Sequence, residues 1–201
     1  MYSLIFDFNL SILGEEADRY LVSILEEWPD LYGEVPGVQG TFFLLNAFGM
    51  AGDYMFRQVV ELDHPGAIRR IDEGMQKNTR WVASREQWAK FRKDARSYLM
   101  KHDDEGTGFM DRLSAPTATT LVSMTSAKVS GEARRSLTAS LASSLRSADG
   151  VDAVRNYVPL VHASGNHGLQ LWATISDYDA LESVGEATSK AFEGRDAVVE
   201  A

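Results

Sequence analysis

The 201-residue sequence contains no cysteine. Disulfide bonds, thiolate nucleophiles, cysteine-ligated zinc and iron–sulfur clusters are therefore excluded together. No apolar run approaches the roughly 20 residues that a membrane-spanning helix needs, and the N-terminus opens on a strand pattern instead of a signal peptide. These absences predict a cytoplasmic protein that folds without disulfides and does not insert into a membrane.

Several motifs of catalysis and cofactor binding are also missing. The sequence has no GxGxxG, no glycine-rich phosphate loop followed by Lys and Ser or Thr, and no GxSxG. We therefore predict neither a nucleotide site nor serine-hydrolase chemistry, and no cofactor or metal. The formal net charge of −9 argues against nucleic acid as a partner, because phosphate contacts require clustered Lys and Arg.

The clearest positive signal is an alternation over the first twelve residues. One set is apolar or aromatic, and the other is largely polar and includes Asp7 and Asn9. A period of two predicts a strand with one buried face. The apolar set is Tyr2, Leu4, Phe6, Phe8, Leu10 and Ile12.

The rest of the first half predicts a helix, two strands and two further helices. The predicted elements are a helix from Glu15 to near Pro29, strands at 38–48 and 54–62 joined by a turn with Gly49, Gly52 and Asp53, a helix capped by Asp63, and a longer helix over Arg85–Lys101 that carries the richest basic run.

The second half repeats this order at an offset of 113 to 117 residues, with Gly150 matching Gly37 and Asp177 matching Asp63. A polar, glycine-containing stretch around residues 102–116 predicts the boundary between two domains, 1–108 and 115–201. The predicted elements are strands at 117–127, 153–163 and 168–176, helices after Ser130 and Asp177, and a closing strand at 197–199.

Strand, helix, strand, strand, helix is the ferredoxin-like unit, and two such units in one chain resemble a tandem member of the dimeric α/β-barrel superfamily. The resemblance implies an α+β fold in which two antiparallel sheets pack face to face as an α/β barrel, with the helices outside. That superfamily includes cofactor-independent antibiotic-biosynthesis monooxygenases, haem-degrading monooxygenases and small isomerases. Of the Asn, Trp and helical His that the haem-degrading branch uses, only Asn9 has an obvious counterpart.

Four polar residues of the first half are candidate catalytic groups. If the apolar face of the first strand packs on helices, Asp7 and Asn9 point to the opposite face, which Arg57 and Glu61 share by alternation. Such a convergent polar set is typical of a small-molecule site. The alternative is a structural ion pair of Arg57 with Glu61 or Asp7, without catalytic duty.

Three residues of the second half are candidate ligand-binding groups: Tyr157, His162 and Trp172. Trp172 alternates with apolar neighbours, so it faces away from the helices and could line a cavity beside Tyr157. His162 flanks a turn together with His167, but no nearby carboxylate completes a metal site. His102 is expected to be exposed in the linker.

Two functions remain open from the sequence. One is a cofactor-independent monooxygenase-like or isomerase-like enzyme that acts on a small aromatic or polyketide-type molecule in a barrel cavity. The other is a non-catalytic barrel that binds a hydrophobic small molecule or serves only in assembly. They differ in whether Asp7 and Arg57 converge on an open cavity or neutralise each other. Pairing with a second chain as a homodimer also stays open.

Overall fold

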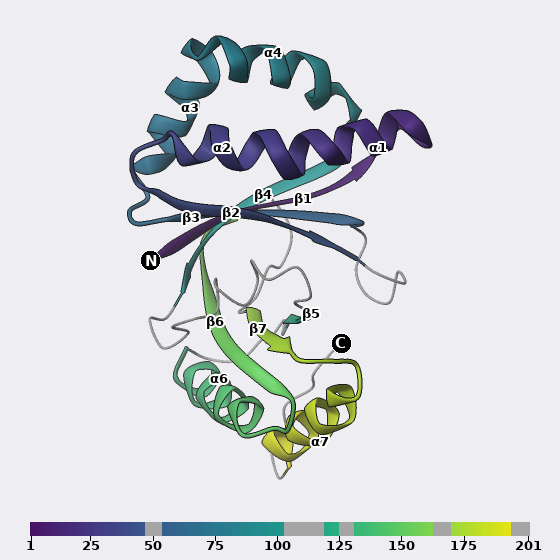
Figure 1. The fold of residues 1–201 in the computed structure, drawn as a ribbon. Coiled ribbons are helices and arrows are strands. Elements are labelled where there is room, and N and C mark those ends of the chain that lie inside the picture. Colours follow the sequence, from purple (N-terminus) through teal and green to yellow (C-terminus); the bar gives the residue numbers. More distant parts are fainter. Residues whose placement is uncertain (47–53, 103–118, 125–130, 163–169, 194–201) are drawn as a thin grey trace. The chain divides into compact units, whose positions relative to one another are not determined.

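The computed structural model describes residues 1–46, 54–102, 119–124, 131–162 and 170–193 (Figure 1). The chain forms two compact units, Met1–Met100 with Leu160–Ser164 and Lys101–Pro159 with Gly165–Ala201. Each unit combines helices with antiparallel strands in the ferredoxin-like order, which confirms the predicted α+β fold class. The face-to-face packing and the boundaries 1–108 and 115–201 stay predictions. None of the described helices is long and apolar enough to cross a membrane.

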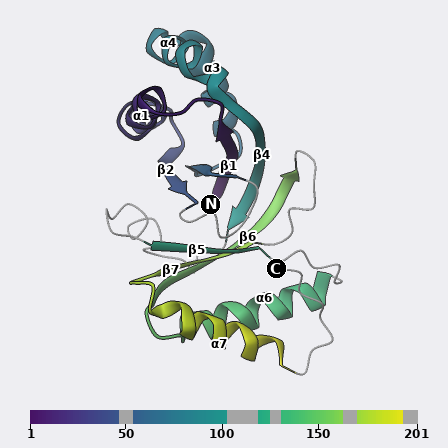
Figure 2. The same ribbon diagram turned by 90° about the vertical axis from the view of Figure 1, so that its right-hand side faces the viewer.

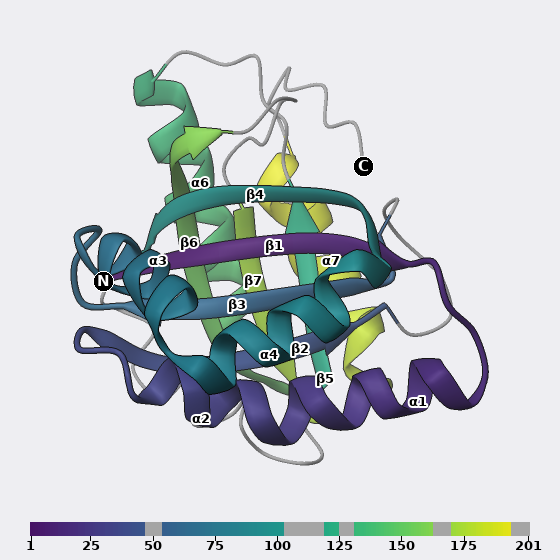
Figure 3. The same cartoon turned by 90° about the horizontal axis from the view of Figure 1, so that it is seen from above.

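The first unit contains a four-stranded sheet in the order β2-β3-β1-β4, and Figure 3 shows these strands side by side. Strands β1 and β2 both run antiparallel to β3. The elements are β1 (Tyr2–Leu10), α1 (Glu15–Val22), a π-helical turn (Ser23–Glu27), α2 (Trp28–Gly33), β2 (Val38–Leu45), β3 (Phe56–Leu62), α3 (Ala67–Lys77), α4 (Thr79–Trp88), a 3₁₀ turn (Ala89–Phe91) and β4 (Arg92–His102).

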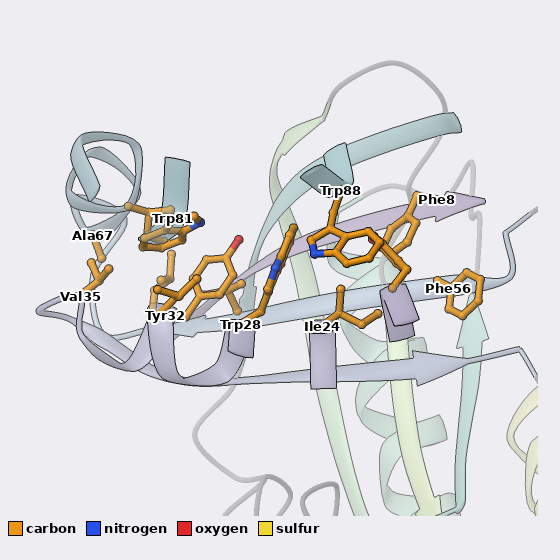
Figure 4. Close-up of a cluster of buried hydrophobic side chains, with 14 of the residues drawn as sticks. Phe8, Ile24, Trp28, Tyr32, Val35, Phe56, Ala67, Trp81 and Trp88 are labelled. Carbon is orange, nitrogen blue, oxygen red and sulfur yellow. The ribbon is translucent and has the colours of Figure 1, made fainter. Parts of the chain in front are cut away.

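The helices of this unit cover one face of its sheet (Figure 1). Phe8 of β1 and Phe56 of β3 stack there at a ring distance of 5.5 Å, and Tyr32 meets Trp81 edge-on at 4.9 Å (Figure 4). Burying one such side chain contributes roughly 1.5 to 3 kcal/mol. The prediction that the apolar set of the first strand packs on helices is thus confirmed.

Two helix boundaries differ from the prediction. The first helix does not end near Pro29, because the π-helical turn at Ser23–Glu27 leads directly into α2, whose first turn contains Pro29. Asp63 does not cap α3; the chain reaches that helix through Gly66, whose N–H donates to His64 Nδ1 at 2.9 Å.

The predicted helix over Arg85–Lys101 is wrong, since α4 ends at Trp88 and the chain continues as strand β4. Asp94 has a φ of +53°, which no α-helix accommodates. After it, Leu99 packs in the helix-side core whereas Tyr98 reaches across to Asp7, so neighbouring side chains point to opposite faces. The helix-like spacing of the aromatic residues was coincidental.

The second unit has the strand order β6-β7-β5, with β5 and β6 antiparallel to β7. Its two helices lie side by side on one face of these strands (Figure 2). The predicted turn at 49–53 and closing strand at 197–199 lie outside the described residues. The elements are β5 (Thr119–Met124), α6 (Gly131–Arg146), β6 (Val151–His162), β7 (Gln170–Ile175) and α7 (Ala180–Phe192).

Gly37 and Gly150 occupy equivalent positions before β2 and β6. Both have positive φ, +92° and +74°, and both carbonyls accept a backbone hydrogen bond, from Asp63 at 3.0 Å and from Ser176 at 2.9 Å. A Cβ would lie 2.7 Å from Asp63 Oδ1 at Gly37 and 2.6 Å from Ala180 Cβ at Gly150. Only glycine fits either position.

Candidate functional site

The four candidate catalytic residues lie on the sheet face opposite the helices of the first unit. In the register of β1 with β3, Asp7 faces Arg57 and Ser3 faces Glu61. These two pairs are four residues apart along the strands, or about 13 Å. The structure therefore brings Asp7 and Arg57 together but keeps Glu61 at a distance.

Asp7 and Arg57 form a bidentate ion pair. Arg57 Nε donates to Asp7 Oδ1 at 2.6 Å and Nη2 donates to Oδ2 at 2.8 Å. The side chain of Asp7 is 3% exposed and that of Arg57 is 14% exposed. Tyr98 of β4 donates its hydroxyl to Asp7 Oδ2 at 2.8 Å. Sequence reasoning missed Tyr98 because it placed this residue on a helix.

The remaining two candidates are also engaged in structural contacts. The fully buried Glu61 accepts a hydrogen bond from Ser3 Oγ at 2.7 Å. Asn9 Oδ1 accepts from the backbone N–H of Met55 at 2.9 Å and so ties β1 to the residue before β3. With both oxygens of Asp7 occupied, this face has the geometry of a structural ion pair that neutralises its own charge.

The second unit carries a different kind of face. Leu171, Ala173 and Ile175 of β7 pack into the core with α6 and α7. Gln170, Trp172 and Thr174 alternate with them and therefore point to the opposite face. In the register with β6, Tyr157 lies beside Gln170 and Arg155 beside Trp172.

Aromatic rings cluster on this second face. Tyr157 and Trp172 are both fully buried, with ring centroids 4.5 Å apart, and His102 lies 5.5 Å from the ring of Tyr157. Trp172 Nε1 donates to Gln170 Oε1 at 3.0 Å, which orients the indole along the strand. The predicted neighbours Tyr157 and Trp172 are indeed in contact.

Two histidine predictions have different outcomes. His102 was expected to be exposed, yet it is the last residue of β4 and only 3% exposed. The side chain of His162 lies outside the described part of the structure, so its ligand-binding role stays a prediction. Within the described ranges, no group of three His, Asp or Glu residues could hold a metal ion.

Gln170 and Thr174 are two residues of this face that the sequence did not single out. Gln170 is fully buried and Thr174 is 1% exposed. Among the described residues, Gln170 Nε2 and Thr174 Oγ1 nevertheless have no hydrogen-bond partner. A buried polar group without a partner costs about 1 to 3 kcal/mol, so each such group requires an explanation.

No family model and no curated protein matches the sequence. Among solved structures, a putative monooxygenase from Fusobacterium nucleatum aligns with a TM-score of 0.67 and 10% identity, over 100% of this chain and 88% of that one. A putative monooxygenase from Lactobacillus acidophilus aligns with a TM-score of 0.63 and 11% identity, over 100% and 89%. An anthrone oxidase-like protein aligns with a TM-score of 0.59 and 12% identity, over 100% and 87%. At these identities the likeness shows the fold alone.

Proposed function

We propose that this chain, which has the ferredoxin-like fold of the dimeric α/β-barrel proteins, binds a small planar aromatic molecule that carries oxygen atoms. The site is the face of β6 and β7 with Tyr157, Gln170, Trp172 and Thr174. One observation supports this most: two buried polar groups that find no hydrogen-bond partner in the described part of the chain lie on the same face as two aromatic rings in contact.

The energetics of this face favour a bound molecule. Each partnerless group costs about 1 to 3 kcal/mol in the free protein, and a ligand oxygen that accepts from Gln170 or pairs with Thr174 would recover that cost. Stacking on Tyr157 or Trp172 would add about 0.5 to 1.5 kcal/mol. A purely structural face would gain stability from an apolar residue at position 174.

The spacing of the polar groups suggests the form of the ligand. Gln170 and Thr174 are four residues apart on β7, which corresponds to about 13 Å, and Trp172 lies midway between them. A planar molecule with an aromatic centre and oxygen atoms toward its ends matches this order of groups.

A second candidate function is turnover of such a molecule by a cofactor-independent monooxygenase-like or isomerase-like reaction. It is favoured by the similar folds named putative monooxygenase and anthrone oxidase-like. For an anthrone, the methylene carbon would lose two hydrogens and gain one oxygen from O₂, with the other oxygen leaving as water. In this case the molecule would bind on the helix-free face of the first unit, where Asp7, Asn9, Arg57 and Glu61 are the proposed polarising groups. The ion pair of Asp7 with Arg57 makes binding the better supported of the two.

Binding is tested by titrating the protein with dihydroxyanthraquinone and following tryptophan fluorescence. Thr174→Val removes only a hydroxyl, so we expect affinity to fall about tenfold, the equivalent of one hydrogen bond. The matched control is Thr188→Val on α7, whose hydroxyl already donates to the Val184 carbonyl. Equal affinity of the Thr174 and Thr188 variants would contradict the proposed site.

Turnover is tested separately with anthrone, by oxygen uptake and by the absorbance of the anthraquinone formed. Product that forms with the native protein and is lost in Arg57→Met, while circular dichroism under the same conditions shows that this variant remains folded, would support the enzyme. Binding without oxygen uptake would mean that the protein binds such a molecule and does not oxidise it.

A further inference from the structure

The side-chain amide of Gln170 is held in one orientation by its neighbour Trp172. Trp172 Nε1 donates to Gln170 Oε1 at 3.0 Å, and both residues are fully buried. An indole N–H can only donate, so the amide atom that faces it must be the oxygen. Turning the amide over would set its NH₂ group against the indole N–H, with two donors face to face. Gln170 Nε2 and its two hydrogens therefore point away from the indole.

Backbone pairing and ring contacts hold both residues in place. Strand β7 lies between β5 and β6, and Gln170 pairs with Met124 on one side and with Tyr157 on the other. The indole of Trp172 contacts the ring of Tyr157, with centroids 4.5 Å apart. Side chains on paired strands are positioned more precisely than side chains on loops. The orientation of the amide is thus built into the folded unit.

The amide leaves a hydrogen-bond donor for a ligand. Among the described residues, Gln170 Nε2 has no hydrogen-bond partner. An amide nitrogen donates and does not accept, so a ligand can satisfy it only with an acceptor. Thr174 Oγ1, four residues further along β7, also finds no partner in the described ranges, but a hydroxyl both donates and accepts. The two ends of this face therefore recognise different chemical groups.

A carbonyl oxygen suits the Gln170 end best, because it is an acceptor that brings no hydrogen of its own. A ligand hydroxyl oxygen can also accept from Nε2, but its hydrogen then needs an acceptor inside a buried site. A ligand amine would set donor against donor. Leaving a buried polar group unpaired in this way lowers affinity by about tenfold or more. The Gln170 end therefore favours a ketone or quinone oxygen.

We propose, on the premise that this face binds the aromatic ligand proposed above, that the ligand is an aromatic ketone or quinone whose carbonyl oxygen accepts from Gln170 Nε2. Trp172 is a positioning residue, because its N–H occupies the amide oxygen and so disfavours ligands that would donate to Gln170. Ring hydroxyls of the ligand lie toward Thr174. The face thereby prefers the quinone form of a ring system to its hydroquinone form.

Equilibrium dialysis of the full chain against three ring systems of one shape tests this selectivity. At the same ring carbon, 9-fluorenone carries a carbonyl, 9-fluorenol a hydroxyl and fluorene a methylene group. We expect fluorenone to bind about tenfold more tightly than either of the others. Gln170→Met should abolish this preference. The matched control is Gln76→Met on α3, whose exposed amide donates to Asp72 at 2.9 Å, and it should keep the preference.

Trp172→Phe tests the positioning role separately. Phenylalanine keeps an aromatic ring but frees Gln170 Oε1, so the amide can turn and accept from a hydroxyl. All three affinities should fall with the loss of indole contact, while those for fluorenone and fluorenol should come within about threefold of each other. Circular dichroism shows whether each variant is folded. If Trp172→Phe is not, the loss of preference in Gln170→Met still decides.

Two kinds of failure are distinguishable. Fluorenol or fluorene that binds the native protein as tightly as fluorenone, or a preference that persists in Gln170→Met or in Trp172→Phe, would overturn the carbonyl assignment and leave the binding face in place. Binding of dihydroxyanthraquinone without binding of fluorenone would do the same. Absence of binding by all four compounds would overturn the binding function and the carbonyl assignment together.

Discussion

Replacing Arg57 by Met should strongly destabilise the first unit. Among the described residues, three hydrogen bonds reach the Asp7 carboxylate; the substitution removes the two from Arg57, at 2.6 and 2.8 Å, and leaves the one from Tyr98. The Asp7 side chain is 3% exposed, so its charge would remain buried without a cation. Breaking a buried pair from one side costs about 3 to 5 kcal/mol, and we expect the free energy of unfolding to fall by that amount.

The assay is urea unfolding followed by circular dichroism, with a double-mutant cycle. Asp7→Leu combined with Arg57→Met removes both charges, so we expect the double variant to lose less free energy of unfolding than Arg57→Met alone. The control is Arg69→Met, because Arg69 is 85% exposed in its pair with Glu73, and loss of such a pair changes stability by less than about 1 kcal/mol. Equal losses for Arg57→Met and Arg69→Met would refute the structural ion pair.

Three further substitutions test individual features. Burial raises the pKa of Tyr32 to about 12, with Arg92 opposing the shift. Between about pH 10 and pH 12 only the unfolded phenol ionises, so the free energy of unfolding falls by about 1.4 kcal/mol per pH unit. The urea midpoint of Tyr32→Phe should therefore decline less steeply over this pH range than that of the native protein. Asp94 has a φ of +53°, so Asp94→Gly should raise the free energy of unfolding by about 0.5 to 1 kcal/mol and Asp94→Ala should not. Thr174→Val removes a partnerless hydroxyl and should stabilise the free protein by about 1 kcal/mol in thermal unfolding, whereas a loss would indicate a hydrogen bond at Thr174 Oγ1.

The sheet face opposite the helices of the first unit is predicted well from the sequence, because strand alternation fixes which side chains share it. Once the apolar set of β1 packs on helices, Asp7 must point the other way, and the same alternation puts Arg57 on that face. That the two residues lie directly opposite depends on the register of β1 with β3, which no local pattern specifies.

Strand β4 was mispredicted because Trp88, Phe91 and Tyr98 happen to match helical spacing. The residue that breaks the helix, Asp94, carries no distinctive sequence signal for positive φ. Tyr98 and His102 were therefore assigned the wrong surroundings. Their actual contacts, with Asp7 and Tyr157, are separated by many residues and follow from tertiary structure alone.

The face of β6 and β7 opposite the helices shows a different limit of prediction from the sequence. The alternation places Trp172 away from the helices, and the structure agrees. Gln170 and Thr174 carried no signal, because polar residues at alternate positions of a strand normally indicate a solvated face. They are distinguished by their burial without hydrogen-bond partners among the residues that the structure describes.

The most direct test of the proposed binding face is the indole N–H region of a ¹⁵N-labelled sample titrated with dihydroxyanthraquinone. The chain has four tryptophans, of which Trp28, Trp81 and Trp88 belong to the helix-side core of the first unit. Spectra of Trp172→Phe identify the fourth signal. We predict that the Trp172 signal shifts with saturation while the other three stay in place. A Trp172 signal that does not move, or four signals that move together, would contradict a site on β6 and β7.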